Sequence, residues 1–139
     1  MKNTSDFKTD LDYGEAAEKM FDGYFRNGNF EFKRDRIMHS TGRVYIEYMS
    51  RGKVSGIGMT EVEPIWIYVT DDCSFGLVMD AARLREAIKI FRKECLQGLH
   101  EPPASYKKKG GDEDTSVGAL IPVEDLARIM LSLAKPTDA

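Results

Sequence analysis

The chain has 139 residues, which is enough for one domain with its own core and too short for two ordinary ones. With 42% hydrophobic and 31% charged residues it has a globular composition, and its net charge of -3 argues against a protein that holds nucleic acid by bulk charge alone. No stretch approaches the apolar run of a membrane span or of a secretory signal, so we expect a cytoplasmic protein without a membrane partner.

The first ten residues are polar, and we expect them to form a flexible N-terminus. A helix is predicted to begin at Asp12, because Asp12 and Glu15 have the spacing of a capping box, in which each side chain satisfies a backbone amide. Asparagine and glycine at 27–29 tolerate left-handed backbone, so the helix should end there. The apolar residues between these ends recur at the spacing of one helical face: Ala17, Met20, Phe21, Tyr24 and Phe25.

Two extended segments, 29–36 and 42–50, follow the helix and are separated by a polar turn at 39–42. Apolar and polar residues alternate along both segments, which is typical of strands with one buried face. We therefore predict that the segments pair as a β-hairpin. The expected core face of this hairpin comprises four residues: Phe30, Phe32, Val44 and Ile46.

The middle of the chain predicts two more strands and a helix. A nearly continuous apolar run at 62–69 suits a strand that is covered on both faces. A shorter strand is predicted at 75–79. Asp80 is a favourable N-cap for the helix predicted at 81–95, whose apolar residues keep to one stripe.

The segment 97–118 contains two consecutive prolines, a lysine run and no apolar periodicity, so it predicts a long loop. A last helix should begin after Pro122, where apolar residues return at helical spacing. No internal repeat is present. The sequence therefore predicts one domain over 1–139.

The two predicted hairpin strands bring acidic residues to the same place. In an antiparallel ladder centred near residue 39, paired numbers keep a constant sum, so Glu31 would lie opposite Glu47. Like charges directly opposite one another destabilise a sheet by roughly 0.2–1 kcal/mol. A divalent cation between the carboxylates would remove this conflict, because hard cations such as magnesium take oxygen ligands. The pattern predicts a metal site at Glu31 and Glu47.

The predicted helix can supply a third acidic ligand. Glu18 lies about 80° from the centre of the apolar stripe, whereas Glu15 lies about 140° away and is already explained as a cap. Lys33 follows Glu31 on the same strand face, where it could orient or deprotonate a water or stabilise negative charge on a phosphate. The catalytic candidates are Glu18, Glu31, Lys33 and Glu47, and the three acids among them are the candidate metal ligands.

Basic residues gather in three stretches of the sequence. One follows Glu31, one lies near residue 52, and the third is the lysine run at 107–109. The lysine run belongs to the predicted loop, and we expect it to be a solvated surface. The candidates for contacts to a nucleic-acid backbone are Arg34, Arg36, Arg51 and Lys53.

The motifs occur in a fixed order along the first half of the chain. They are the helical acids Glu15 to Glu18, then Glu31-Phe32-Lys33-Arg34-Asp35, then Thr41-Gly42-Arg43 with Ile46-Glu47, then Gly52-Lys53-Val54-Ser55-Gly56-Ile57, and finally Trp66. This order resembles that of the PD-(D/E)xK nuclease superfamily, in particular small phage-type endonuclease-like proteins. The likeness covers roughly residues 10–70 and is looser afterwards.

The resemblance implies an α/β (α+β) fold with a mixed central β-sheet flanked by helices, a restriction-endonuclease-like core. It also implies magnesium or manganese as cofactor, DNA as partner and, for a phage-encoded protein, action in the host cytoplasm; a homodimer is left open. The family usually has an Asp on the first strand and Glu-x-Lys on the next. Either the lysine has moved to the first strand here, or Asp12 supplies the upstream acid and Glu31-Phe32-Lys33 is the complete motif. Arg43 stands where the family has an Asn.

Two functions follow from these patterns. The first is a metal-dependent nuclease, endo- or exonucleolytic, that hydrolyses phosphodiester bonds in DNA. The alternative is a non-catalytic DNA-binding or assembly protein that retains a nuclease-like fold, since a fold does not fix a function. Tight binding of a divalent metal at the carboxylates would favour the first. A small interaction protein with an ordinary charged sheet face would bind neither metal nor DNA.

Overall fold

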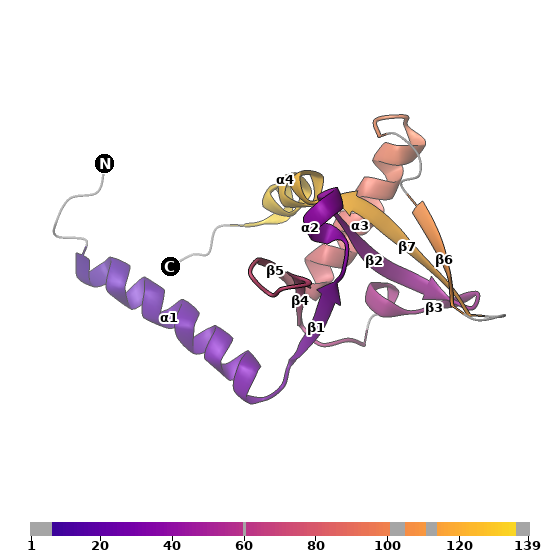
Figure 1. The fold of residues 1–139 in the computed structure, drawn as a ribbon. Helices are drawn as coiled ribbons and strands as arrows, with labels where there is room; N and C mark the ends of the chain where they lie inside the picture. The colour runs from indigo at the N-terminus through magenta and orange to yellow at the C-terminus, as the bar shows by residue number, and fades with distance from the viewer. Residues whose placement is uncertain (1–6, 60, 101–104, 111–113, 136–139) are drawn as a thin grey trace. The chain divides into compact units, whose positions relative to one another are not determined.

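The computed structural model describes residues 7–59, 61–100, 105–110 and 114–135. The chain divides into two compact units, one up to Phe30 and one from Glu31 onwards, and each is described by itself. The secondary structure is α+β, with helices and strands both present in the described residues (Figure 1). The expectation of a single domain stays a prediction.

The first unit contains the helix α1, Phe7–Arg26. It begins five residues before Asp12, so Asp12 and Glu15 lie inside the helix and the predicted capping box is wrong. Nothing in residues 7–11 breaks a helix, and Asp10 in the first turn interacts favourably with the helix dipole. The predicted end is confirmed, because Gly28 has a φ of 67° and the Asn29 amide donates to the Tyr24 carbonyl at 2.9 Å.

The second unit contains two small sheets instead of one central sheet. The first has the order β1-β4-β5 and consists of β1, Phe30–Asp35, β4, Ile65–Thr70, and β5, Gly76–Asp80. The second has the order β3-β2-β7-β6 and consists of β3, Lys53–Val54, β2, Arg43–Ser50, β7, Asp114–Pro122, and β6, Ser105–Gly110.

The predicted hairpin between β1 and β2 is wrong, although both strands are present. β1 pairs with β4, whereas β2 pairs with β3 and β7, so that Glu47 lies opposite Gly118 and not opposite Glu31. The cause lies in the connection. The carboxylate of Asp35 accepts hydrogen bonds from the amides of Ile37 and Met38 at 3.0 and 2.9 Å, which starts the short helix α2, Met38–Thr41, in place of a tight turn.

The predicted loop at 97–118 contains the strand β6 and the start of β7, which pair with each other as an antiparallel hairpin. The lysine run therefore lies in a strand. The sequence of β6 has no apolar periodicity, so it carries no local signal for a strand. This segment forms a strand by pairing with β7. The partner β7 has small residues where it crosses β2, since Gly118 and Ala119 face Glu47 and Ile46.

The core of the second unit lies between the sheets and two helices: α3, Ala81–Leu96, and α4, Val123–Leu133. Figure 1 shows α3 behind the pair β2–β7. All six residues of β4 are buried, as expected for its continuous apolar run. The predicted cap of α3 is confirmed, because the Asp80 carboxylate accepts from the Arg83 amide at 2.8 Å. Residues that are fully buried in this core include Val44, Ile46, Leu84, Phe91, Ile121, Leu126 and Ile129.

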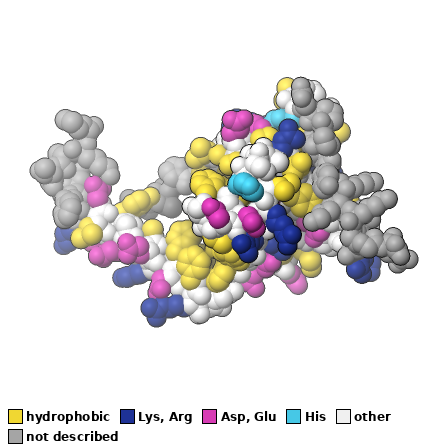
Figure 2. All heavy atoms as spheres, viewed as in Figure 1, with side chains coloured by type: hydrophobic (Ala, Val, Ile, Leu, Met, Phe, Trp, Pro, Cys, Tyr) yellow, Lys and Arg dark blue, Asp and Glu magenta, His cyan; other side chains and the backbone are white. Residues whose placement is uncertain are grey.

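Two of the predicted core residues are not in the core, because Phe30 is only half-buried and Phe32 is exposed. The side chain of Phe32 is 52% exposed, whereas Val44 and Ile46 of the same prediction are completely buried. The exposure of Phe32 follows from the pairing of its strand, because β1 is at the edge of its sheet and is not covered by β2. Among the described residues, no helix is both long and apolar enough to cross a membrane. Figure 2 shows acidic and basic side chains interspersed on the face in view, which agrees with the small net charge.

Candidate functional site

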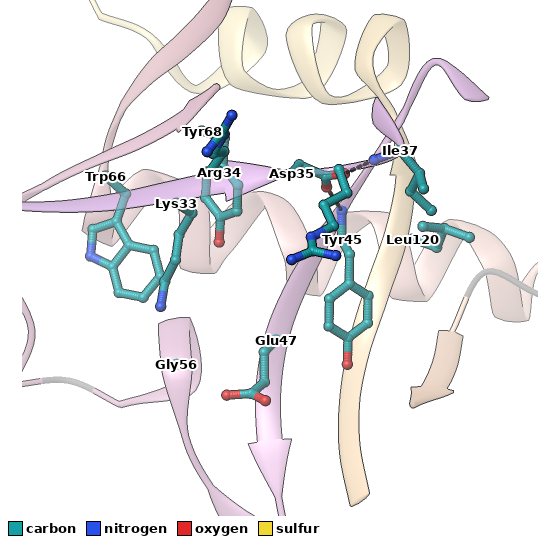
Figure 3. Close-up of a pocket in the computed structure, with 11 residues that line it drawn as sticks. Lys33, Arg34, Asp35, Ile37, Tyr45, Glu47, Gly56, Trp66, Tyr68 and Leu120 are labelled. Atoms are coloured by element: carbon teal, nitrogen blue, oxygen red, sulfur yellow. Dashed lines mark hydrogen bonds between the residues drawn. The ribbon is translucent and has the colours of Figure 1, made fainter. Parts of the chain in front are cut away.

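A pocket of about 580 Å³ lies between the two sheets of the second unit. Strand β1 contributes Lys33, Arg34 and Asp35 to its lining, and strand β2 contributes Tyr45 and Glu47 (Figure 3). Residues of two different sheets therefore meet here, although their strands do not pair. The pocket brings together Lys33 and Glu47, two of the four catalytic candidates.

The remaining walls of the pocket are largely apolar and aromatic. Trp66 and Tyr68 come from β4, Leu120 comes from β7, and Ile37 follows β1. The rings of Trp66 and Tyr68 are stacked with centroids 6.3 Å apart, and the indole nitrogen donates to the Glu63 carbonyl at 3.1 Å. Both rings are almost fully buried, so they form a rigid wall.

Glu47 is held by hydroxyl groups on two sides. The hydroxyl of Ser55 donates to one of its carboxylate oxygens at 3.1 Å, and the hydroxyl of Ser116 donates to the other at 2.5 Å. Ser116 also shares a hydrogen bond of 2.5 Å with the Tyr45 hydroxyl. The ladder between β2 and β7 shifts register directly after Glu47, and bulges of this kind re-aim side chains near functional sites. The carboxylate is therefore fixed in one orientation.

Two glycines permit this arrangement. A Cβ atom at Gly118 would lie 2.6 Å from the ring of Tyr45, so only glycine lets that ring reach across β7 towards Ser116. Gly56 has a φ of 52°, and a Cβ atom there would collide with the Glu47 carbonyl. The loop that carries Ser55 thus approaches β2 closely because its next residue has no side chain.

Lys33 lies at the border of the pocket and has two neighbours. Its amino nitrogen is 3.0 Å from a carboxylate oxygen of Glu31, and it lies above the Trp66 ring at 5.8 Å from the centroid. The side chains of Lys33 and Glu31 are 46% and 40% exposed, so the ion pair is open to solvent and contributes little to stability. The pair is available to a ligand that enters the pocket.

The pKa of the Tyr68 hydroxyl is raised by its surroundings in the pocket. Burial raises the pKa of its hydroxyl, and the carboxylates of Glu31, Asp35 and Glu47 raise it further. Three acidic side chains from β1 and β2 act on this one ring, and Figure 3 shows the ring directed into the pocket beside Lys33.

Asp35 has a structural role that the sequence left open. In addition to its two bonds to α2, its carboxylate accepts from the Tyr45 amide at 3.2 Å and so links β1 to β2. Three backbone amides therefore already donate hydrogen bonds to the Asp35 carboxylate. This makes Asp35 a poor substitute for Glu31 or Glu47 as a metal ligand.

The candidate nucleic-acid contacts fall into two places. Arg34 and Arg36 line the pocket, and the Arg34 guanidinium also donates to the Asp71 carbonyl at 2.7 Å. Arg51 and Lys53 lie at the turn from β2 to β3, beyond the Ser50 end of β2. One pair of basic residues is thus part of the pocket, and the other lies at the far end of β2.

The oxygen atoms of the site can be compared with the ligands that a divalent cation prefers. Glu31 and Glu47 offer carboxylate oxygens, and Ser55 and Ser116 offer hydroxyl oxygens beside Glu47. This chemistry fits magnesium or manganese, which take oxygen ligands and are often bound by one or two carboxylates plus substrate phosphate. In the described part of the chain, no three acidic, histidine or cysteine side chains form a metal-binding group. Glu18 lies on α1 in the other unit, and the convergence of Glu18, Glu31 and Glu47 on one ion stays a prediction.

Four residues of the site were missed by sequence reasoning: Tyr45, Ser55, Ser116 and Tyr68. Ser55 stood within a motif that was noted, next to Gly56, but nothing local connects it to Glu47. Ser116 is 69 positions from Glu47 and lay in the segment predicted as a loop. Tyr68 is in the core, as its apolar neighbours predict, and the pattern does not show that it also lines a pocket. Comparisons of the chain with protein-family models, with curated proteins and with solved structures find no match.

Proposed function

We propose that this protein is a metal-dependent nuclease of the PD-(D/E)xK type that hydrolyses phosphodiester bonds in DNA. One observation carries the proposal: the pocket is lined by Lys33 from β1 and Glu47 from β2, and Lys33 is paired with Glu31. A lysine between two strand acids, beside Arg34 and Arg36, is suited to an anionic phosphodiester.

In this proposal Glu31 and Glu47 would hold magnesium or manganese, and Glu18 would be the third acidic ligand. The bound ion would lower the pKa of a water and polarise the phosphate. The Ser55 and Ser116 hydroxyls hold the Glu47 carboxylate in place before a metal arrives, so little reorganisation is needed on binding.

The basic residues have separate roles. Lys33 offers its charge to the non-bridging or leaving oxygen as negative charge develops there. Arg36 and Arg34 contact the flanking phosphates, and Arg51 and Lys53 extend these contacts beyond the pocket.

A non-catalytic DNA-binding or assembly protein is the second candidate. A specific observation favours it: both strand acids already have partners in the protein, since Glu47 accepts two hydroxyl hydrogen bonds and Glu31 is paired with Lys33. A metal would have to replace or share these partners. Such a protein would use the basic residues alone and would bind DNA equally well in the presence of a chelator.

The deciding experiment is a cleavage assay on single-stranded, duplex and branched DNA and on RNA, with magnesium, with manganese and with chelator. Cleavage that needs metal and is lost in Glu31→Gln and Glu47→Gln supports the nuclease. Glu86→Gln is the matched control, because Glu86 is exposed on α3. Binding of DNA without cleavage under every metal condition would leave the second candidate.

A further inference from the structure

The pocket has features that a simple phosphate site does not need. We propose that it takes the phosphate and the unstacked base of one unpaired nucleotide, so that the strand is single-stranded where it is bound. This inference rests on the proposed function for nucleic acid as the substrate, and it adds the form of the substrate.

The size of the pocket is the first argument. Its volume of about 580 Å³ is far more than one phosphate group fills. Pockets of roughly 300–1,000 Å³ bind whole small molecules, a class that includes a nucleotide.

The composition of the walls is the second argument. The cations Lys33, Arg34 and Arg36 come from β1 and the residue after it, and the aromatic pair Trp66 and Tyr68 comes from the neighbouring strand β4, with Lys33 over the Trp66 ring. Proteins that bind single strands combine these two features, because the cations follow the backbone and the bases stack on aromatic or apolar side chains. In a duplex each base is already stacked, so such a wall would have no partner.

The polar groups at the pocket are the third argument. The Tyr68 ring is directed into the pocket beside Lys33, so its hydroxyl offers a hydrogen-bond donor there. The Tyr45 hydroxyl, linked to Ser116 at 2.5 Å, lies on the β2 side. Donors and acceptors at fixed places suit the edge of a base that has left its pair.

The chain carries its own reporter for this proposal, because Trp66 is the only tryptophan and lines the pocket. Its fluorescence is recorded during titration of the full chain, in chelator to prevent cleavage. The ligands are a short oligothymidylate, the same strand with an abasic site at every position, a duplex of mixed sequence, and inorganic phosphate.

We expect a saturable change of Trp66 emission with oligothymidylate. Loss of the bases should weaken binding by about tenfold or more, since stacking of one base contributes roughly 1–3 kcal/mol. The duplex should bind more weakly and change the emission little. Tyr68→Phe removes only a hydroxyl and should weaken oligothymidylate binding by about threefold to tenfold. Tyr13→Phe on the exposed part of α1 is the matched control and should change nothing.

Two results would overturn the inference. One is equal or tighter binding of the duplex with the same change of Trp66 emission. The other is the full emission change with abasic strand or with phosphate alone. The assay is separate from the cleavage assay. Metal-dependent cleavage without the Trp66 response would overturn this inference and leave the proposed nuclease function. The Trp66 response without cleavage would support single-strand binding and overturn the nuclease function.

Discussion

The carboxylate of Glu47 accepts hydrogen bonds from Ser55 and Ser116, and these bonds determine how the residue should be tested. If Glu47 faced Glu31 across a hairpin, removing either acid would relieve repulsion and stabilise the sheet. In the structure, the loss of Glu47 instead leaves two partly buried hydroxyls without their acceptor. Alanine and glutamine substitutions should therefore behave differently.

We predict that Glu47→Ala lowers the free energy of unfolding by about 1–3 kcal/mol, because unsatisfied buried polar groups carry a cost of that size. Glu47→Gln keeps a carbonyl acceptor and a similar shape, so it should lower the free energy of unfolding by less than about 1 kcal/mol. Both variants should lose metal-dependent cleavage. Urea unfolding and the cleavage assay measure the two effects, and a Glu47→Gln protein with normal activity would remove this carboxylate from the metal site.

At Lys33 the ion pair with Glu31 is exposed, so the residue is free to act on a ligand. We predict that Lys33→Met lowers kcat by about 10²-fold or more, the usual effect of removing one group that stabilises transition-state charge. The Kd for DNA should change only a few-fold, since other cations remain in the pocket. Lys89→Met on the exposed face of α3 is the matched control. A variant that loses affinity and keeps its kcat would make Lys33 a binding residue only.

The turn between β2 and β3 has a left-handed backbone conformation that bears on function. Arg51 and Gly52 both have positive φ, 51° and 74°, in the two-residue connection between the paired residues Ser50 and Lys53. Hairpin turns of this kind favour Asn-Gly, and a left-handed arginine costs roughly 1–2 kcal/mol. An arginine at such a position is a reason to look for a role in binding.

We predict that Arg51→Asn raises the melting temperature and at the same time weakens DNA binding and reduces its dependence on salt concentration. The gain in stability should be about 0.5–1 kcal/mol, since asparagine tolerates left-handed backbone. Thermal unfolding and titrations at several salt concentrations measure the two effects. Lys53→Gln is the comparison for charge loss without relief of strain. If Arg51→Asn bound DNA normally, the turn would have no part in the nucleic-acid surface.

Helices α3 and α4 are joined by a cluster of charged side chains. Glu94 accepts from the Arg128 guanidinium at 2.7 Å and is 2.8 Å from a ring nitrogen of His100, which also lies 3.9 Å from Asp125. The hydrogen bond from Arg128 and then that from His100 hold the pKa of Glu94 below its ordinary value. Because the folded-state pKa is lowered, the cluster stabilises the fold above that ordinary value and loses this effect as the pH falls through the folded pKa.

We predict that Arg128→Met lowers the melting temperature at neutral pH, and that its difference from the unsubstituted protein shrinks as the pH falls below about 4.5, the ordinary pKa of a glutamate. Arg128 is half exposed, so solvent screening keeps the difference small. Melting curves between neutral and acidic pH measure it, with Arg83→Met as control. A difference that does not change with pH would mean that Arg128 stabilises the helices by packing and not by charge.

The same elements explain what could be predicted from sequence. Strand β4, the cap at Asp80 and the last helix carried strong local signals and were confirmed. The pairing of β1 with β4 and of β2 with β7 joins distant segments, and no local pattern encodes it. The polar residues near 39 suggested a hairpin turn. The amides of Ile37 and Met38 instead donate to the Asp35 carboxylate, and residue spacing does not predict these hydrogen bonds.

For the whole molecule, Lys33 and Glu47 were expected together because of a hairpin register that is wrong, and they line one pocket because residues of two different sheets meet there. Alternation along the strand does not account for this, because four consecutive residues, 33–36, all line the pocket. The neighbours of Glu47 were beyond this reasoning, because Ser116 comes from a strand with little local signal. The chain divides into two compact units at Phe30, and the single domain suggested by its length stays a prediction.

This division leads to a last prediction, on the role of α1. The second unit has its own core, so a fragment of residues 28–139 should fold cooperatively, with a melting temperature within about 4–8 °C of the full chain, the shift expected from about 1 kcal/mol. It should retain the Trp66 response to oligothymidylate, because every residue that lines the pocket is present.

The fragment should nevertheless lose metal-dependent cleavage, because the proposed ligand Glu18 is missing. Glu18→Gln in the full chain should reproduce this loss, and the neighbouring Lys19→Gln should not. If Glu18→Gln stays active while the fragment is inactive, α1 contributes through Asp12 or Glu15, both of which lie within the helix and are available. An active fragment would exclude α1 from the metal site altogether and leave Glu31, Lys33 and Glu47 as its complete acidic and basic set.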